Sequence, residues 1–440
     1  MRHLGWLPRA AGVVLGVALS MAAAIAGCSD GAVAPAGGTA GTPPSSEGSV
    51  TPSPGGVGNV RVDFSACAVG AMPLWFAFQD GAGEWTRIVG ADDVYRFDVA
   101  SAKGGYAYAT MGSGRVLNVA YATRHELTRS PIAVCRAPGQ KAVSGRFAGL
   151  GAGHVAYVGL GEPNPDPERA PRRERSFTLT GIDDGAQDLV AYRSESPRFA
   201  GTERVVIRRD QNVVHGGTLG VVDFDGAESF EPATASLTVT GAGGLPVAQW
   251  MSYFTGPTCA LHDLYYDESG GTAFTMRGIP AALQRATDMH RVDVYTTAGG
   301  GFRAASEVFH ALADRVVAFP QELPAPAISA PPGRHRRLAA SLTLPAEYRN
   351  GEVLLLMYAY GEHGAFAYVR ATPGWLGGPA VTLAVPDLGG AAGWHDAFLP
   401  PPDASVGWIV QATGSTGAPA DGGVCAENAR FVLAYVGGRS

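Results

Sequence analysis

The stretch "LWFAFQDGAGEWTRIV", Leu74 to Val89, indicates the fold class of this chain. Two runs rich in aromatic and aliphatic residues flank the sequence Asp-Gly-Ala-Gly at 80–83, and turn residues between two such runs are typical of a β-hairpin. Short runs of the same kind recur along the chain, from "VYRFDVA" at Val94 to "RFVLAYVGG" at Arg430. The sequence therefore predicts a mainly β protein built from tandem antiparallel β-sandwich domains.

The composition agrees with this prediction. The 440 residues include 61 glycines and 31 prolines, which interrupt the chain at short intervals, as expected for many short strands joined by turns. Hydrophobic residues make up 46% of the chain and charged residues only 16%, so a sizeable core can form. The net charge of −6 provides no basic field, so we expect no nucleic-acid partner.

The N-terminus has the order of an export signal. Arg2 and Arg9 are followed by an apolar run at 10–26 and then by Cys28; roughly 17 apolar residues are at the lower limit for spanning a bilayer. The tetrad at 25–28, Ile-Ala-Gly-Cys, resembles the lipobox of bacterial lipoproteins, with Ile25 where the family prefers Leu. An ordinary cleaved signal and an uncleaved membrane helix are the alternatives.

The lipobox resemblance implies a cleaved signal peptide at 1–27 and a Cys28 that carries acyl chains as the first mature residue. Several acyl chains are needed for stable attachment to a membrane, so the implied partner of Cys28 is the lipid bilayer. Ser29, in place of an acidic residue, implies the outer membrane of the cell envelope. Residues 28–59 are rich in Gly, Pro and Ser and contain no aromatic residue, which predicts a disordered linker.

Four further cysteines support an exported protein. Cys67, Cys135, Cys259 and Cys425 are an even set, which suggests two disulfides with three possible pairings. We favour Cys67–Cys135 and Cys259–Cys425 because each pair brackets one folded segment, and four reduced cysteines are the alternative. No pair has the close spacing of a zinc site, so we expect no metal.

The linear pattern suggests three folded regions. A small β domain is expected at 60–138, a β-sandwich at 139–232 and a large β region, one big or two smaller sandwiches, at 233–440. Within the second region, three motifs resemble carboxypeptidase regulatory-like modules: Val143-Ser144-Gly145, the strand at 155–158 and the element at 177–185. That resemblance implies a prealbumin-type β-sandwich with an accessory or binding role and no catalytic residues.

Catalytic motifs are not evident in the sequence. It contains no G-x-S-x-G elbow, its histidines are scattered, and no glycine pattern indicates a nucleotide cofactor. Six tryptophans are able to stack on sugar rings: Trp75, Trp85, Trp250, Trp375, Trp394 and Trp408. We favour Trp375 in "TPGWLGG" and Trp394 in "GAAGWHDAF" because glycine-rich loops expose side chains.

The leading hypothesis is a non-enzymatic envelope lipoprotein that binds a glycan or a protein partner and needs no cofactor. Two alternatives remain open. One is an envelope hydrolase whose site is assembled from residues far apart in the sequence. The other is a structural stalk.

Overall fold

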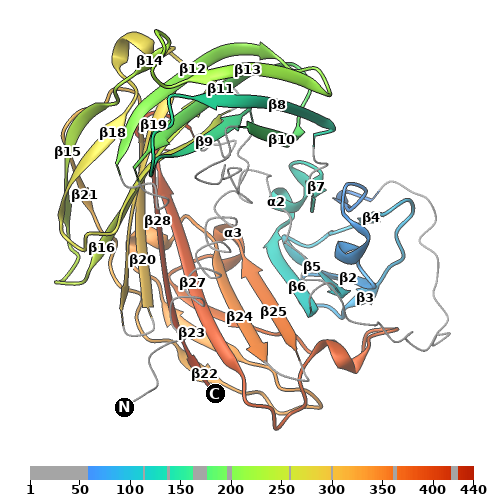
Figure 1. Ribbon diagram of the computed structural model, residues 1–440. Coiled ribbons are helices and arrows are strands. Elements are labelled where there is room, and N and C mark those ends of the chain that lie inside the picture. The colour runs from blue at the N-terminus through green and yellow to red at the C-terminus, as the bar shows by residue number, and fades with distance from the viewer. Residues whose placement is uncertain are drawn as a thin grey trace. The chain divides into compact units, whose positions relative to one another are not determined.

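The computed structural model describes residues 58–111, 114–135, 139–161, 176–195, 201–256, 259–298, 301–359, 364–417 and 425–440. The chain divides into two compact units, coloured by residue number in Figure 1. Unit 1 lies within 1–137, 322–414 and 434–440, and unit 2 lies within 138–321 and 415–433. Cys28 and the signal segment fall outside the described residues.

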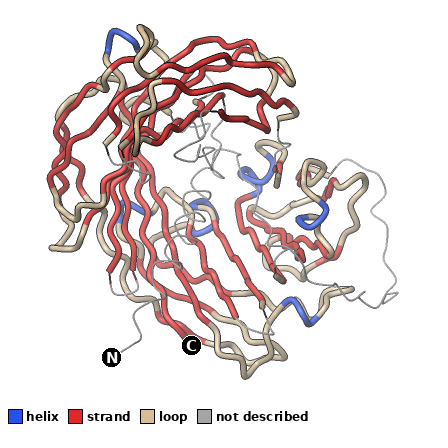
Figure 2. Tube along the Cα trace, viewed as in Figure 1, coloured by secondary structure: helices blue, strands red, loops and turns tan. Residues whose placement is uncertain are grey.

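Both units are mainly β, as predicted, and strands dominate the trace in Figure 2. The described α-helices are short: α2 (Arg124–Thr128) and α3 (Pro373–Leu376). Within the described part of the chain, no helix has the length and apolar character needed to cross a bilayer. The two predicted disulfides are confirmed: Cys67–Cys135 lies in unit 1 and Cys259–Cys425 in unit 2.

Unit 1 contains three sheets. The largest has the strand order β27-β24-β25-β6-β5-β2-β3, and two smaller sheets have the orders β4-β1-β7 and β22-β23-β26. The strands are β1 (Val60–Asp63), β2 (Trp75–Asp80), β3 (Thr86–Arg87), β4 (Val94–Phe97), β5 (Lys103–Met111), β6 (Arg115–Thr123), β7 (Ile132–Ala133), β22 (Ala327–Ser329), β23 (Ala339–Thr343), β24 (Val353–Ala359), β25 (Ala365–Ala371) and β26 (Ala380–Ala384). The boundary between the units falls within β27 (Gly407–Thr416) and β28 (Arg430–Arg439).

Alternation along the strands explains how unit 1 packs. On β2 and β5, Phe76 and Tyr106 face the small β4-β1-β7 sheet and form a core with Val62, Phe64 and Phe97. Strands β24 and β25 also pack against β26. The predicted hairpin at 74–89 is present, because Ala77 and Phe78 of β2 pair with β3. The segment at 60–137 therefore shares its unit with 322–414.

Unit 2 contains four groups of strands, ordered β10-β8-β13, β14-β12-β11-β9, β18-β15-β21 and β17-β16-β19-β20. Their bounds are β8 (Lys141–Ala148), β9 (Val155–Leu160), β10 (Ser176–Ile182), β11 (Ala186–Ser194), β12 (Thr202–Asn212), β13 (Gly217–Asp223), β14 (Ser229–Phe230), β15 (Ala233–Thr240), β16 (Val247–Thr255), β17 (Ala260–Asp267), β18 (Ala273–Gly278), β19 (Met289–Ala298), β20 (Gly301–Phe309) and β21 (Arg315–Ala318).

The first two groups form one β-sandwich. Its core holds Phe147 of β8, Phe177 of β10, Leu189 of β11 and Phe224, which directly follows β13. The third and fourth groups pack against each other as a second layer pair. The two pairs meet where His262 of β17 approaches Gly159 of β9 so closely that a Cβ at Gly159 would lie 2.8 Å from the imidazole Nδ1. Glycine is therefore required at this contact.

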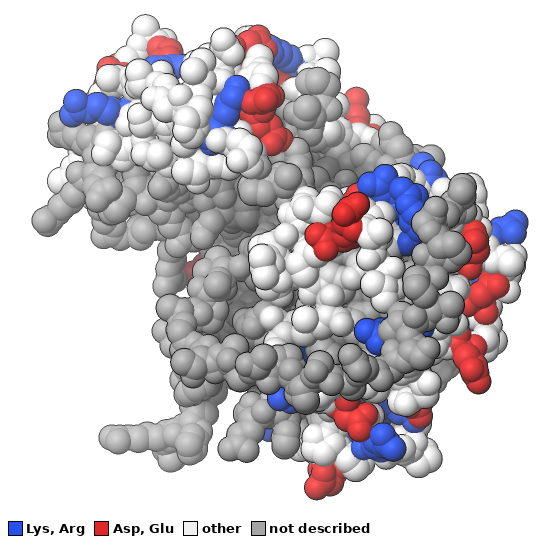
Figure 3. All heavy atoms as spheres, turned by 90° about the vertical axis from the view of Figure 1, so that its right-hand side faces the viewer, with Lys and Arg blue, Asp and Glu red and all other residues white. Residues whose placement is uncertain are grey.

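Charge is mixed on the surface. On the face of the molecule in Figure 3, Lys and Arg side chains of the described residues lie among Asp and Glu side chains. Local ion pairs such as Arg208–Glu228 and Arg337–Asp387 contribute to this mixture.

Candidate functional site

Trp375 lies on α3 in unit 1 and is half-buried. Its ring stacks on Tyr121 with 4.7 Å between the centroids and an interplanar angle of 23°. The ammonium of Lys103 lies 5.6 Å from the Trp375 centroid and also donates to the Trp375 carbonyl. The ring predicted to stack on a sugar thus already has an aromatic and a cationic partner within the protein.

Trp394 is also half-buried and lies in the loop before Phe398. Its ring meets Trp75 edge to face at 4.9 Å and Phe398 at 5.7 Å. The indole Nε1 of Trp394 is sealed from solvent and has no hydrogen-bond partner among the described residues. Trp375 and Trp394 belong to separate aromatic clusters, so the structure does not bring them together as one binding platform.

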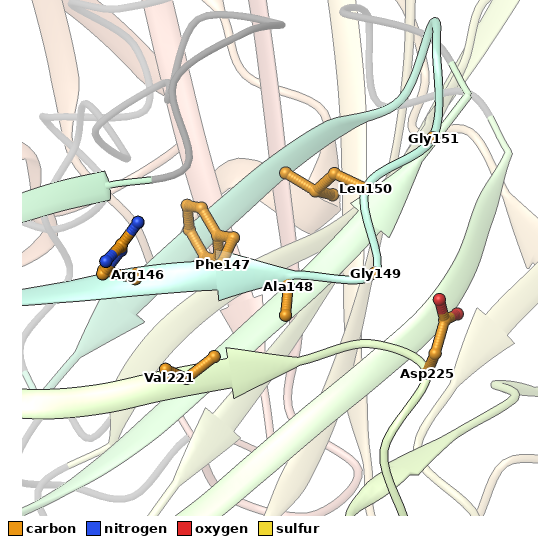
Figure 4. Close-up of a pocket in the computed structure, with 8 residues that line it drawn as sticks. All are labelled: Arg146, Phe147, Ala148, Gly149, Leu150, Gly151, Val221 and Asp225. Carbon is orange, nitrogen blue, oxygen red and sulfur yellow. The ribbon is translucent and has the colours of Figure 1, made fainter.

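A shallow hollow of about 530 Å³ opens on the first sandwich of unit 2 (Figure 4). Phe147 and Leu150 line it from β8 and the following loop, and Val221 lines it from β13. Arg146 and Asp225 are its charged residues. The hollow therefore has a mixed polar and apolar lining.

The acidic side of the hollow is already paired with an arginine. Arg193 donates to Asp225 Oδ1 at 2.9 Å, to the Gly149 carbonyl at 2.6 Å and to Glu203 at 3.1 Å. His154 Nε2 lies 3.3 Å from the same Glu203 oxygen. These contacts fix the loop after β8, so we assign this charge cluster a structural role.

A second set of polar and aromatic side chains shares one face of β16, β17, β19 and β20 in unit 2. We call it the acid–aromatic face. Its members are Trp250, Ser252, Asp263, Tyr266, Arg291, Asp293, Tyr295 and Ser306. Strand register places them together because directly paired residues project to the same side of a sheet.

A register shift builds this face. Ser252 of β16 pairs with Asp263 of β17, whereas Met251 pairs with Tyr265 and Trp250 pairs with Tyr266. Leu264 is therefore an extra residue on β17, which is the property of a β-bulge. As a result Asp263 and Tyr266 lie on the same side, although three positions apart, and Leu264 and Tyr265 are both buried on the other side.

Asp263 is held by two donors from β16. Trp250 Nε1 donates to Asp263 Oδ1 at 2.9 Å and Ser252 Oγ donates to the same oxygen at 3.1 Å. Among the described residues, both hydrogen bonds that Asp263 accepts reach Oδ1, so Oδ2 keeps its acceptor capacity. Burial raises the pKa of Asp263 from 3.8 to about 6, against the lowering effect of the Trp250 and Ser252 hydrogen bonds.

Asp293 is the second carboxylate of this face. Arg291 donates to its Oδ1 from Nε at 2.9 Å and from Nη2 at 2.7 Å, and Ser306 Oγ donates to the same oxygen. Both carboxylates are therefore oriented by fixed donors on one oxygen. Such preorganisation lowers the entropic cost of accepting a further hydrogen bond from a ligand.

Aromatic rings border the two acids. Trp250 lies 5.4 Å from Tyr266, and Tyr266 stacks at 6.5 Å on Tyr295. The hydroxyl of Tyr295 donates to that of Tyr266 at 2.8 Å, and Tyr266 donates to Glu268. The three rings are half-buried, so each presents part of its surface beside oriented carboxylates.

This face was not predicted from the sequence. Trp250 was considered only as one of several tryptophans, and Asp263 and Asp293 were not considered. The alternation in "WMS" at 250–252 and "RVD" at 291–293 was the available signal, because it places Trp250 with Ser252 and Arg291 with Asp293 on one side of each strand. Alternation along β17 does not predict the side of Asp263 relative to Tyr266, because the bulge at Leu264 changes it.

A third cluster lies between the two layer pairs of unit 2. Arg209 donates to Asp188 at 2.8 Å and to the fully buried Asp288 at 2.6 Å, and Tyr253 donates to Asp288 at 2.7 Å. Burial raises the pKa of Asp288, but the Arg285 amide, the Tyr253 hydroxyl and the Arg209 guanidinium outweigh it and hold this pKa below 3.8. Each charged group named here is paired within the cluster, and we assign it a structural role.

No metal-binding site is evident in the described part of the chain. No group of three or more His, Cys, Asp or Glu side chains there is arranged to hold an ion.

Comparison with known proteins adds little. No protein-family model and no curated protein sequence matches this chain. Among solved structures, the chain is similar to the Bacillus anthracis TIE protein at 10% sequence identity and a TM-score of 0.14. That alignment covers 82% of this chain and 66% of the other, just under two thirds. A similarity of this size carries no conclusion about fold or function.

Proposed function

We propose that this protein is a lipid-anchored protein of the bacterial outer membrane that binds a glycan through the acid–aromatic face. The lipobox-like sequence at Cys28 supports the anchor, and two disulfides are characteristic of proteins that fold in an oxidising compartment. Together they support a location in the cell envelope.

One observation carries the binding role: half-buried aromatic rings lie beside two oriented carboxylates on a rigid sheet. A sugar presents apolar C–H groups on its ring faces and hydroxyl donors at its edges. Trp250 and Tyr266 offer aromatic surface for the ring face, and the free Oδ2 of Asp263 accepts a hydroxyl hydrogen. Strands hold such groups more accurately than loops do.

The test uses the full-length protein in detergent and an array of envelope glycans. Trp250→Ala and Asp263→Asn are compared with Trp408→Ala and Asp403→Asn, which alter a half-buried tryptophan and an exposed aspartate outside the face. We expect Trp250→Ala to weaken glycan binding at least tenfold and both controls to change it less than twofold. If the wild-type protein binds no glycan, or binds one with unchanged affinity after Trp250→Ala, the proposal is wrong.

Hydrolysis is the second candidate function, and one observation favours it. Asp263 has a pKa raised by burial to about 6, whereas Asp293 is paired with Arg291. Glycoside cleavage uses one carboxyl group that holds a proton and a second that stays charged. Two carboxyl groups in different environments meet this requirement. Release of reducing ends from a bound glycan, lost in Asp263→Asn, would establish this function. Binding without release would restrict the face to recognition.

The anchor has its own test. Cells expressing the wild-type protein or Cys28→Ala are labelled with a palmitate analogue and fractionated. We expect label only in the wild-type protein, and we expect it in the outer-membrane fraction. Equal labelling of both proteins, or none, would contradict the lipobox interpretation without affecting the glycan proposal.

A further inference from the structure

Arg370 in unit 1 is paired differently from Arg209 and Arg303 in unit 2. Arg209 is paired with two carboxylates. Arg303 donates to the carbonyls of Gly241, Ala242 and Pro320. Arg370 makes one hydrogen bond within the described residues, from Nη2 to the Tyr106 hydroxyl at 2.9 Å.

Sheet register explains the position of the Arg370 side chain. Arg370 of β25 pairs with Ala120 of β6, and Ala120 pairs with Tyr106 of β5. The small side chain of Ala120 lets the guanidinium extend across β6 and reach the phenol on the next strand. On the other side, Arg370 pairs with the buried Leu354 of β24. The cation is thus enclosed by alkyl and aromatic groups.

The neighbouring row of the same face adds polar groups. Tyr368 of β25, Asn118 of β6 and Tyr108 of β5 are paired in register. The rings of Tyr106 and Tyr108 stack at 6.4 Å. Burial raises the pKa of Tyr108 to about 12, and the charge of Arg370 opposes that rise, so Tyr108 stays a neutral hydroxyl. The Asn118 amide is half-buried and has no side-chain hydrogen bond among the described residues.

No carboxylate of the described residues forms an ion pair with Arg370. The negative charge of Glu352 raises the pKa of Arg370. The two side chains are nevertheless too far apart to form an ion pair. A guanidinium has five N–H donors in a planar fork, and leaving an enclosed charge without a counter-ion is costly. The remaining donors are therefore available to an external acceptor, because Arg370 is only partly buried.

We propose that Arg370, with Asn118 and the phenol of Tyr108, forms a binding site for an organic oxyanion, in which the buried Tyr106 orients the guanidinium. A carboxylate is the best fit, because two parallel N–H groups of the fork match its two oxygens. The aromatic groups around the cation suit a carboxylate attached to a ring, as in an acidic sugar. This site lies in unit 1 and is separate from the acid–aromatic face in unit 2, so it extends the proposed function.

The experiment is calorimetric titration of the full-length protein in detergent with four probes. Glucuronate carries a carboxylate, glucose 1-phosphate carries a phosphate ester, inorganic phosphate is the free ion and glucose is the neutral control. We expect glucuronate to bind and glucose not to bind. Stronger binding of glucose 1-phosphate would identify a phosphate ester as the ligand group, and binding of inorganic phosphate alone would contradict an organic ligand.

Variants identify the residue responsible. Arg370→Gln removes the charge, and Arg96→Gln removes a charge from an exposed position on β4 in the same unit. We expect Arg370→Gln to weaken glucuronate binding at least tenfold and Arg96→Gln to change it less than twofold. Arg370→Lys keeps the charge and loses the planar fork of N–H donors, so it should weaken carboxylate binding severalfold. This variant replaces Arg370→Gln in the test if Arg370→Gln does not fold. The proposal is overturned if no oxyanion binds the wild-type protein, or if binding survives both substitutions of Arg370.

Discussion

Trp250 on β16 donates its indole N–H to Oδ1 of Asp263 on β17, 2.9 Å away, across the point where the register of these strands shifts. The contact fixes an aromatic ring beside a carboxylate whose second oxygen remains an acceptor. It also places a carboxyl group where burial raises its pKa to about 6. The same contact therefore makes the acid–aromatic face both a candidate binding site and a pH-dependent element.

Asp263→Asn should stabilise the protein at high pH. The folded pKa, about 6, exceeds the ordinary value of 3.8. As pH rises through this interval, the unfolded chain loses its proton before the folded one, so stability falls, and the full penalty of up to about 3 kcal/mol is present above pH 6. Asparagine keeps the acceptor for Trp250 and Ser252 without the charge. We expect a gain of about 1–3 kcal/mol at pH 8 and almost none at pH 3.5.

Urea unfolding of both proteins at these two pH values measures the difference. Asp403→Asn, at an exposed position, is the control and should change neither value. A variant that is no more stable than the wild type at pH 8 would show that Asp263 is not electrostatically strained.

Acid should destabilise unit 2 through two histidines. Burial lowers the pKa of His262 and of His290 from 6.5 to about 4. Both remain neutral in the folded protein while the unfolded chain binds protons, so stability is lost as pH falls from 6.5 towards 4. Two such groups together lower the free energy of unfolding by roughly 2–3 kcal/mol per pH unit near pH 5.

His262→Gln checks this prediction. Glutamine does not titrate, so the contribution of one histidine, roughly 1 kcal/mol per pH unit between pH 4.5 and 6, should be lost from the slope of unfolding free energy against pH. His125→Gln, at an exposed position on α2, should leave the slope unchanged. A slope that is equally steep in His262→Gln would assign the acid sensitivity to other groups.

The two disulfides should stabilise the protein to different extents. They close segments with sequence separations of 68 and 166 residues. The loop-entropy model gives about 4 kcal/mol for Cys67–Cys135 and about 5 kcal/mol for Cys259–Cys425. Denaturant unfolding of the paired Cys→Ser variants measures both effects. Loss of less than 1 kcal/mol in either variant would indicate that the unfolded chain is already compact in that segment.

Replacing Trp394 by alanine should destabilise the protein more than replacing Trp375 does. Trp394 packs on Trp75 and Phe398, so Trp394→Ala should destabilise unit 1 by about 3 kcal/mol. Trp375 stacks on a single aromatic partner, Tyr121, and Trp375→Ala should cost about 1 kcal/mol. Thermal unfolding ranks the two. Glycan binding by the same variants tests the prediction that these rings stack on a sugar, and a loss of affinity without a loss of stability would favour that role.

Much of the architecture could be predicted from the sequence because it depends on local signals. Alternation and turn residues predicted the hairpin at 74–89, and cysteine positions predicted both disulfide pairs. The grouping of segments could not be predicted. The segment at 60–137 shares unit 1 with 322–414 because β6 pairs with β25 in parallel, and no local pattern encodes a pairing between strands so far apart.

The sequence by itself determined the strand content, the even set of four cysteines after Cys28 and the lipobox-like tetrad, because each depends on neighbouring residues or on their number. Only the tertiary structure decided which tryptophan meets an acid. Side chains alternate between the two faces of a strand with a period of two, and the extra residue Leu264 changes the side on which every later residue of β17 projects. Asp263 and Tyr266 thus share a face that alternation alone assigns to opposite sides.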